Sequence, residues 1–447
     1  MKVLYRLFGL IYGTQQLIVR RFSPSGISIL ICLIGAALIG IDTKQTMAYQ
    51  VFTFLLAVLL IAISFSLVFK VRLTVQRHLP RFATVGVKVS YRLTIFNKTK
   101  KIQRGLSFIE EIRQPKFSFA EFKQIIKQKS VKKSVKSLSY IYLQWLKAIA
   151  RKRKAQVKAI ALSSLKPNTE TVVKGEITPT HRGIVRLEAV SFLRPDPFNV
   201  FNAVKTISQP QSLLVLPRRY QLPAINLPGS RMSQSGSVSL ASSVGDSEEF
   251  VSLRDYRPGD PLRRIHWKSW AKTGQPVVRE EQSEYFVRQA LILDTFQPES
   301  ESTILEEAIS IAASFACDFH TQESLLDLMF VGLQSYCFTS GRGLGSSEQM
   351  LEVLAGVQAC QDKTFDYLTA AVIEKLSALS GCICIFITWD KEREKLVHKL
   401  QQFNIPLLIL LLAETEQEYG QINVENLHIL PLNQIQESLL LLRLNSN

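Results

Sequence analysis

A run of twenty residues near the middle of the chain, 249–268, holds most of the side chains that could do chemistry. It contains carboxylates, guanidinium groups and one imidazole, so Asp260 and His266 are a conceivable acid and base pair. Pro258 and Gly259 predict a tight turn, because proline fixes φ and glycine permits positive φ. No nucleophile is spaced to work with His266. We therefore expect a recognition or joining surface here, and no catalytic residue.

The candidate site consists of the polar and aromatic side chains of this run. They are Glu249, Arg254, Tyr256, Arg257, Gly259, Asp260, Arg263, His266, Trp267 and Lys268. One interpretation is a docking surface for another protein. The other is a clasp that fastens two domains of this chain together. The ion pairs of such a clasp would join Arg254, Arg263 and Arg264 to Glu249, Asp255 and Asp260.

The run resembles the signature of the DUF58 family, which has no settled biochemical activity. The matching positions are Glu249, Phe250, Leu253, Arg254, Tyr256, Gly259, Asp260, Arg263, Ile265, Trp267, Lys268, Ala271, Lys272, Thr273 and Gly274. The resemblance extends to 181–183, 194–198 and a strand-like run that ends at Asp294. It implies a small β-sheet domain between a membrane and the signature. It also implies companionship with MoxR-type AAA+ ATPases, which act in assembly or maturation of other complexes. The chain has no Walker A motif, so a partner would supply ATP hydrolysis.

Asp294 is a second candidate, at the end of a buried strand expected over 290–294. The order of elements from this strand onward resembles a von Willebrand factor A domain, whose D-x-S-x-S motif binds a divalent metal. The motif positions here hold Asp294, Thr295, Phe296, Gln297 and Pro298. Phe296 and Pro298 offer Mg²⁺ no side-chain oxygen. We therefore expect a degenerate motif with no metal or cofactor, of which Asp294 is the remnant.

Two domains with different strand patterns are expected to carry these candidates. Residues 289–447 alternate continuous apolar strands with helices, which predicts a parallel sheet covered on both faces. Residues 71–220 contain short runs that alternate apolar with polar residues, which predicts a small antiparallel β-sandwich. Cys382 and Cys384 fit a buried strand better than a metal site. The expected fold class is therefore α/β plus β.

Two uncharged runs, 27–41 and 48–69, predict a transmembrane helical hairpin over 27–70. Basic residues flank both sides of the hairpin, so the positive-inside rule places both termini and most of the chain in the cytoplasm, at the plasma (inner) membrane. The basic N-terminal segment, 1–26, has a partly helical apolar pattern that suits a segment lying on the membrane.

A basic helical insertion is expected over 115–160, since residues 71–166 hold 24 Lys and Arg against three acidic residues. Its apolar stripe is Val131, Val135, Leu138, Tyr142, Trp145 and Ile149. Its candidate membrane-surface residues are Lys132, Lys133, Lys136, Arg151, Lys152, Arg153 and Lys154. Three interpretations are open: contact with anionic lipid headgroups, packing of the stripe on the sheet, or nucleic-acid binding. We favour the first and expect no nucleic-acid partner.

A Ser- and Gly-rich linker, 221–247, precedes the signature region at 248–288. The whole pattern predicts a membrane-anchored cytoplasmic interaction or scaffold protein that works with a MoxR-type AAA+ ATPase. One alternative is a membrane-associated enzyme that uses Asp260 and His266. Another is a membrane-organising protein that acts through its basic helix.

Overall fold

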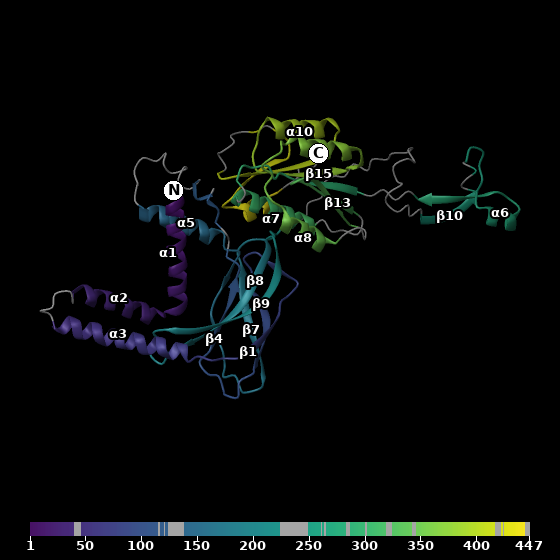
Figure 1. The fold of residues 1–447 in the computed structure, drawn as a ribbon. Helices are drawn as coiled ribbons and strands as arrows, with labels where there is room; N and C mark the ends of the chain where they lie inside the picture. Colours follow the sequence, from purple (N-terminus) through teal and green to yellow (C-terminus); the bar gives the residue numbers. More distant parts are fainter. Residues whose placement is uncertain are drawn as a thin grey trace. The chain divides into compact units, whose positions relative to one another are not determined.

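The chain forms two compact units, Met1–Arg218 and Arg219–Asn447 (Figure 1). The computed structural model describes residues 1–39, 46–114, 117–119, 121–123, 138–223, 249–260, 262, 265–282, 287–299, 302–318, 324–341, 346–415, 422 and 424–442. Most of the linker expected over 221–247 therefore lies outside the described residues.

The first unit contains two β-sheets. Their strands are β1 (Leu73–His78), β2 (Phe82–Thr84), β3 (Val89–Asn97), β4 (Ser107–Ile112), β5 (Ala155–Val157), β6 (Ile160–Ala161), β7 (Glu170–Pro179), β8 (Gly183–Pro195) and β9 (Asn202–Leu216). One sheet has the order β1-β3-β7-β5 and is antiparallel. The other has the order β2-β9-β8-β4-β6, in which β2 and β9 run parallel and the other pairs antiparallel. The expected antiparallel sheets are thus present.

Alternation of apolar and polar residues builds the core of this unit. In β1 every second residue is buried, and Leu93 and Phe192 belong to the same apolar cluster. One ion pair is also enclosed. The Arg77 guanidinium donates to both oxygens of Glu110 at 3.1 and 2.6 Å, and the Tyr91 hydroxyl donates to the same carboxylate at 2.6 Å. Such a pair is tolerated inside a protein because hydrogen bonds offset part of its desolvation.

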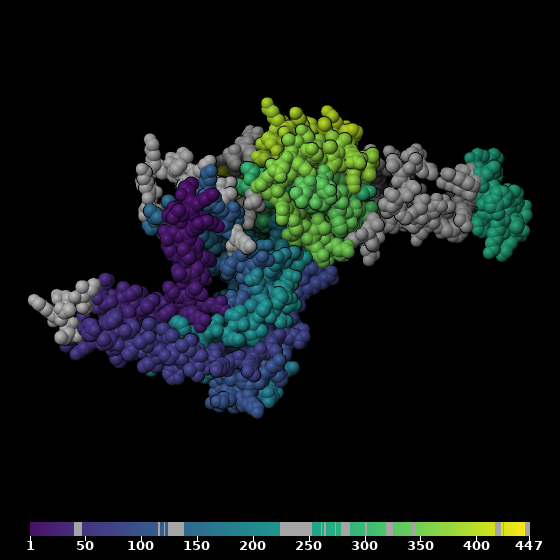
Figure 2. Space-filling view, viewed as in Figure 1, coloured from purple at the N-terminus to yellow at the C-terminus, as the bar shows by residue number. Residues whose placement is uncertain are grey.

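Three helices precede the sheets: α1 (Lys2–Arg21), α2 (Pro24–Ile39) and α3 (Thr46–Leu67). Among the described residues, α3 is the helix long and apolar enough to cross a membrane, and α2 is a shorter apolar helix. The two pack side by side, as the purple and indigo atoms of Figure 2 show. Their apolar side chains are largely exposed, since only 6% of the α3 stretch is buried.

The base of α2 is bonded to the loop between β8 and β9. The hydroxyl of Ser23 donates to the carbonyl of Asn199, and the backbone N–H of Ser23 donates to the carbonyl of Val200 at 3.1 Å. Asp196 shapes this loop by accepting the N–H of Val200 at 2.6 Å. A Cβ on Gly26 would lie 2.0 Å from the Val200 oxygen, so only glycine permits this approach.

The helix α5 (Leu138–Arg151) packs on α1 through an aromatic cluster. Phe8 of α1 lies buried against Trp145 of α5, with ring centroids 5.8 Å apart. Phe122 and Ile149 complete the buried group. The cluster thus joins the N-terminal helix to a segment more than a hundred residues away.

Part of the predicted apolar stripe is confirmed. Tyr142 packs against the cluster, whereas Leu138 is exposed. Val131 and Val135 lie outside the described residues. The described part of the stripe packs on helix α1. This partner was not among those expected from the sequence, which were the membrane surface and the sheet.

The second unit contains a six-stranded sheet of order β14-β13-β12-β15-β16-β17. Its strands are β12 (Val287–Leu293), β13 (Ser324–Val331), β14 (Ser335–Ser340), β15 (Gly381–Phe386), β16 (Leu407–Ala413) and β17 (Leu427–Pro431). Its helices are α7 (Thr303–Asp318), α8 (Ser347–Gly356), α9 (Asp366–Lys375), α10 (Lys391–Gln402) and α11 (Ile435–Leu440). All pairs are parallel except that of β13 and β14. Every residue of β15 and β16 is buried, as their continuous apolar runs predict.

A separate two-stranded sheet in this unit carries the signature. The strands β10 (Glu249–Asp255) and β11 (Val277–Gln282) pair antiparallel, and the short helix α6 (Trp267–Thr273) lies between them in the chain. Gly274 ends α6 in the left-handed conformation with φ of 70°, which glycine adopts readily. The Thr-Gly pair at the end of the signature thus has a local structural role.

Candidate functional site

Arg254 and Asp260 close the turn of the signature. The Arg254 guanidinium donates Nη1–H and Nη2–H to the two Asp260 oxygens, at 2.7 and 2.8 Å. The backbone N–H of Arg257 donates to the same carboxylate at 2.9 Å. Gly259 lies between them with φ of 108°, a value that side chains disfavour. A bidentate arginine–carboxylate pair requires one relative orientation of its two groups. The pair of Arg254 and Asp260 therefore holds the turn in a single conformation.

The electrostatics of this turn disfavour proton transfer by Asp260. The hydrogen bond from Arg254 lowers the pKa of the Asp260 carboxyl to about 2, and the N–H of Arg257 acts in the same direction. A carboxylate with so low a pKa is a weak base at neutral pH. His266 precedes α6 at its N-cap position, and its Nδ1 lies 2.7 Å from the hydroxyl oxygen of Ser269 in the helix. The geometry therefore does not join these residues as an acid and base pair.

The signature also exposes apolar side chains. The rings of Trp267 and Trp270 stack with centroids 5.2 Å apart. Trp267 is 62% exposed, and Leu262 in the same segment is 67% exposed. In the same segment Ile265 is buried, and it forms a β-bridge with Val278 of β11, which is buried as well. A small packed base thus presents large apolar groups to solvent.

The other signature residues add few contacts to the site among those that the structure describes. Tyr256 is partly buried, and Arg257 and Lys268 are exposed. The side chain of Glu249 and the residues Arg263 and Arg264 lie outside the part of the chain that the structure describes. Among the described residues, the clasp interpretation predicted an ion pair between Arg254 and Asp260. This pair is present, but it lies within a single turn and does not join two domains.

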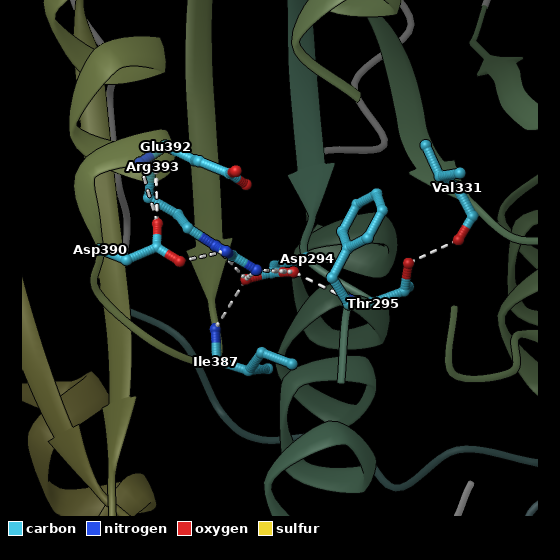
Figure 3. A network of polar contacts seen from close by, with 8 residues as sticks. Asp294, Thr295, Val331, Ile387, Asp390, Glu392 and Arg393 are labelled. Carbon is cyan, nitrogen blue, oxygen red and sulfur yellow. Dashed lines mark hydrogen bonds and ion pairs between the residues drawn. The ribbon is translucent and has the colours of Figure 1, made fainter. Parts of the chain in front are cut away.

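Asp294 lies at the end of β12 and is completely enclosed (Figure 3). The Arg393 guanidinium donates Nε–H to its Oδ2 at 3.1 Å and Nη2–H to its Oδ1 at 3.2 Å. Backbone N–H groups of Phe296 and Ile387 add one bond to each oxygen, at 3.0 and 3.4 Å. Four N–H donors therefore surround this carboxylate.

Arg393 is itself fixed by its neighbours. Asp390 caps the start of α10 by accepting the N–H groups of Glu392 and Arg393, and its other oxygen accepts Arg393 Nη1–H at 2.5 Å. The guanidinium carbon lies 4.3 Å from the centre of the Phe365 ring. This cation–π contact and the two carboxylates hold the side chain in one orientation.

Burial and charge oppose each other at this site. Burial raises the pKa of the Asp294 carboxyl, and the Arg393 guanidinium acts against that rise. For Arg393, burial tends to lower the pKa, but Asp294 and Asp390 outweigh it and raise the pKa. The guanidinium therefore stays charged, and the charge of Asp294 depends on it.

The donor set around Asp294 does not fit a metal ion. The guanidinium supplies the positive charge that a metal would bring, and N–H groups approach both carboxylate oxygens. Thr295 turns away, because its hydroxyl donates to the carbonyl of Val331 at 2.5 Å (Figure 3). Phe296 and Pro298 have no ligand oxygen. Within the described ranges no group of three His, Cys, Asp or Glu residues could hold a metal ion.

Three of the basic candidates near α5 make polar contacts within the protein. Lys152 donates to Glu121 at 2.8 Å, Arg153 to the hydroxyl of Tyr12 at 3.3 Å, and Lys154 to a backbone carbonyl of β8 at 3.1 Å. Arg151 is exposed. Lys132, Lys133 and Lys136 lie outside the described residues.

Two residues of this site, Asp390 and Arg393, were not predicted from the sequence. The signal for Asp390 was present, since an aspartate before a helical run is a typical N-cap. Nothing local marks Arg393, because its partner Asp294 lies 99 residues earlier in the chain.

Comparison with known proteins gives a family match over part of the chain and structural likenesses that are weak. No curated protein matches the chain. A human solved structure described as "ASH / PapD-like domain of human CEP192 (PapD-like domain 7)" has 9% sequence identity and a TM-score of 0.18, over 33% of this chain and 86% of that chain. That score is too low to support an argument. Residues 252–375, from within strand β10 to the last residue of α9, match the model of the family described as "Protein of unknown function DUF58", so this part of the chain is similar to that family.

Proposed function

We propose that this protein is a membrane-anchored interaction protein whose signature segment docks a MoxR-type AAA+ ATPase. The observation that carries the proposal is the exposure of Leu262 and Trp267, in the segment that directly follows the turn held by Arg254 and Asp260. Large apolar groups on a rigid base are the typical anchors of protein interfaces. The AAA+ class of the partner rests on the family resemblance.

Anchoring in the membrane is supported by the exposure of α2 and α3. An apolar helix in a soluble protein buries its side chains, whereas α3 leaves most of its side chains uncovered. Two such helices side by side would together form a hairpin through the bilayer. The basic flanks favour cytoplasmic positions for both termini and for the signature.

The α/β sheet supports a scaffold function. Its order, with a central first strand and an antiparallel edge strand, resembles that of a von Willebrand factor A domain. Open sheets of this kind bind ligands where the strand order reverses, beyond the carboxyl ends of the strands. Here the ends of β12 and β15 are closed by Asp294 and Arg393. Because buried side chains occupy the place where such sheets bind ligands, contacts through the outer surface are favoured over chemistry at the strand ends.

The proposal is tested by affinity purification of the tagged full chain from gently solubilised membranes, with mass spectrometry. We expect a stoichiometric AAA+ ATPase with the wild type and at least a tenfold loss with Trp267→Ala/Leu262→Ala. The matched control is Phe403→Ala, which removes an aromatic side chain that is 58% exposed at the end of α10. Equal recovery from the double variant and the control would refute the docking surface. Absence of any AAA+ protein after crosslinking would refute the partner class.

A further inference from the structure

A pocket between α1 and α5 is not used by the function proposed above. Its volume is ≈ 230 Å³. It is lined by Tyr5, Arg6, Gly9, Tyr12, Gln114, Phe117, Trp145 and Ile149. Aromatic walls with a few polar groups are characteristic of ligand sites. The chemistry of those polar groups indicates which ligand would fit.

The polar side chains that line the pocket include a cation and an indole donor. The Nε1–H of Trp145 is buried and has no acceptor among the described residues, a costly state. Arg6 is exposed at the pocket and has no carboxylate partner within the described ranges. Two more cations contact wall residues: Lys152, which is already paired with Glu121, lies 5.5 Å from the centre of the Phe117 ring, and Arg153 donates to the Tyr12 hydroxyl. An anionic oxygen group is the complementary ligand.

The outer face of α1 shows where such a ligand would come from. Val3, Leu7, Leu10 and Leu17 recur at helical spacing and are all exposed. They lie on a different side of α1 from Phe8, which packs on α5. Helix α1 therefore has an aromatic face inside the protein and an apolar stripe that the described residues leave open.

The geometry of α1 and the hairpin favours one occupant for that stripe. Helix α1 ends at Arg21 and α2 begins at Pro24, and Figure 1 shows α1 running across the direction of α2 and α3. If the hairpin crosses a bilayer, α1 lies parallel to the membrane surface where the hairpin leaves it. At that depth an amphipathic helix meets acyl chains on one side and headgroups on the other.

We propose that the pocket binds the anionic headgroup of a phospholipid from the surrounding bilayer. A phosphate oxygen would accept from Arg6 and from the indole N–H of Trp145, while the acyl chains of the same lipid would cover the apolar stripe of α1. The inference rests on the membrane anchoring in the proposed function, and it adds lipid selectivity. Free phosphate shares the headgroup chemistry but leaves the stripe uncovered.

Gly9 provides a direct test. It lines the pocket, and a Cβ added to it meets no atom within 4 Å, so Gly9→Leu would fill the pocket without a clash. Gly13 is equally open on the same helix but does not line the pocket, so Gly13→Leu is the matched control. Both variants replace a helical glycine, so both should fold at least as well as the wild type.

Binding is measured as the fluorescence anisotropy of labelled phosphatidylglycerol and labelled phosphatidylcholine, each titrated with the detergent-solubilised full chain. We expect the wild type and Gly13→Leu to prefer phosphatidylglycerol at least tenfold. Gly9→Leu should lose that preference, and Arg6→Gln should weaken it about fivefold, since one cation near a headgroup is removed. Equal selectivity of Gly9→Leu and Gly13→Leu would overturn the proposal. Competition by inorganic phosphate at equal concentration would assign the site to a free anion instead.

Failure of the anchoring is recognised separately. Extraction of the wild-type chain from membranes by alkaline carbonate would refute the hairpin and with it the source of the lipid. Retention in the membrane together with equal binding of the two phospholipids would overturn the pocket assignment alone.

Discussion

Replacing Arg393 by methionine should destabilise the sheet of the second unit, and the loss should depend on pH. The side chain is 5% exposed and binds Asp294 through two hydrogen bonds. Removal of one partner from a buried pair costs about 3–5 kcal/mol, because the other charge is left uncompensated. The cation–π contact with Phe365 is lost as well, although methionine retains much of the apolar packing.

The pH dependence follows from Asp294. Burial raises the pKa of its carboxyl in the folded protein, and without Arg393 nothing charged opposes that rise. A raised folded-state pKa gives stability that is present below the unfolded value of about 3.9 and is lost as pH rises through the folded value. The variant should therefore be closest to wild type at acidic pH and furthest from it at pH 8.

Hydrogen exchange is the suitable assay, because a two-unit chain need not unfold in one step. Opening free energies of β12 and β15 are compared between wild type, Arg393→Met and the control Lys395→Met, which alters an exposed residue of the same helix. The double variant Asp294→Asn/Arg393→Met should recover at least about 1 kcal/mol relative to Arg393→Met. Unchanged exchange in Arg393→Met, or no recovery in the double variant, would show that this pair does not hold the strand ends together.

Three further predictions follow from the contacts described. Asp260→Asn should speed hydrogen exchange at the signature turn, because it removes the ion pair with Arg254. In the wild type this ion pair should stop stabilising the turn only as pH falls below about 4 toward the lowered Asp260 pKa of about 2, which hydrogen exchange across that pH range would measure. Arg77→Met should lower the stability of the sandwich by about 3–5 kcal/mol, since it leaves a buried carboxylate unpaired, and denaturation followed by exchange in β3 and β8 checks this. Gly26→Ala should cost about 1–3 kcal/mol, because the new Cβ overlaps the Val200 oxygen, and faster proteolysis at the base of α2 is the readout.

The regular parts of the fold could be predicted from the sequence. The alternation along β1 and the continuous apolar runs of β15 and β16 each reflect one environment along a whole strand, so the period of the sequence alone identifies these strands. The edge strands β14 and β17 were missed. β14 is half exposed and mixes Ser, Tyr and Thr, and β17 has five residues, so neither offers a clear period.

The candidate site was predictable only in outline. The turn at Gly259 could be predicted from its Pro-Gly sequence. The partner of Asp260 could not, because several arginines lie near it in the sequence and nothing there distinguishes Arg254 from the others. The lack of ligand oxygens at Phe296 and Pro298 could be read from the sequence. The pairing of the Arg393 guanidinium with Asp294 could not, because sequence periodicity carries no information on a contact between residues 294 and 393.

The loop held by Asp196 has a mechanical consequence. Helix α2 is bonded at its start to this loop between β8 and β9, and only five residues separate the end of α3 from β1. Phe69, within that short connection, packs into the sandwich core. The two sheets are therefore attached to helices α2 and α3 at two points, and both connections are short. A force or torque applied to the sheets would be transmitted to both helices, so the sheets and the two helices should move together as one rigid unit.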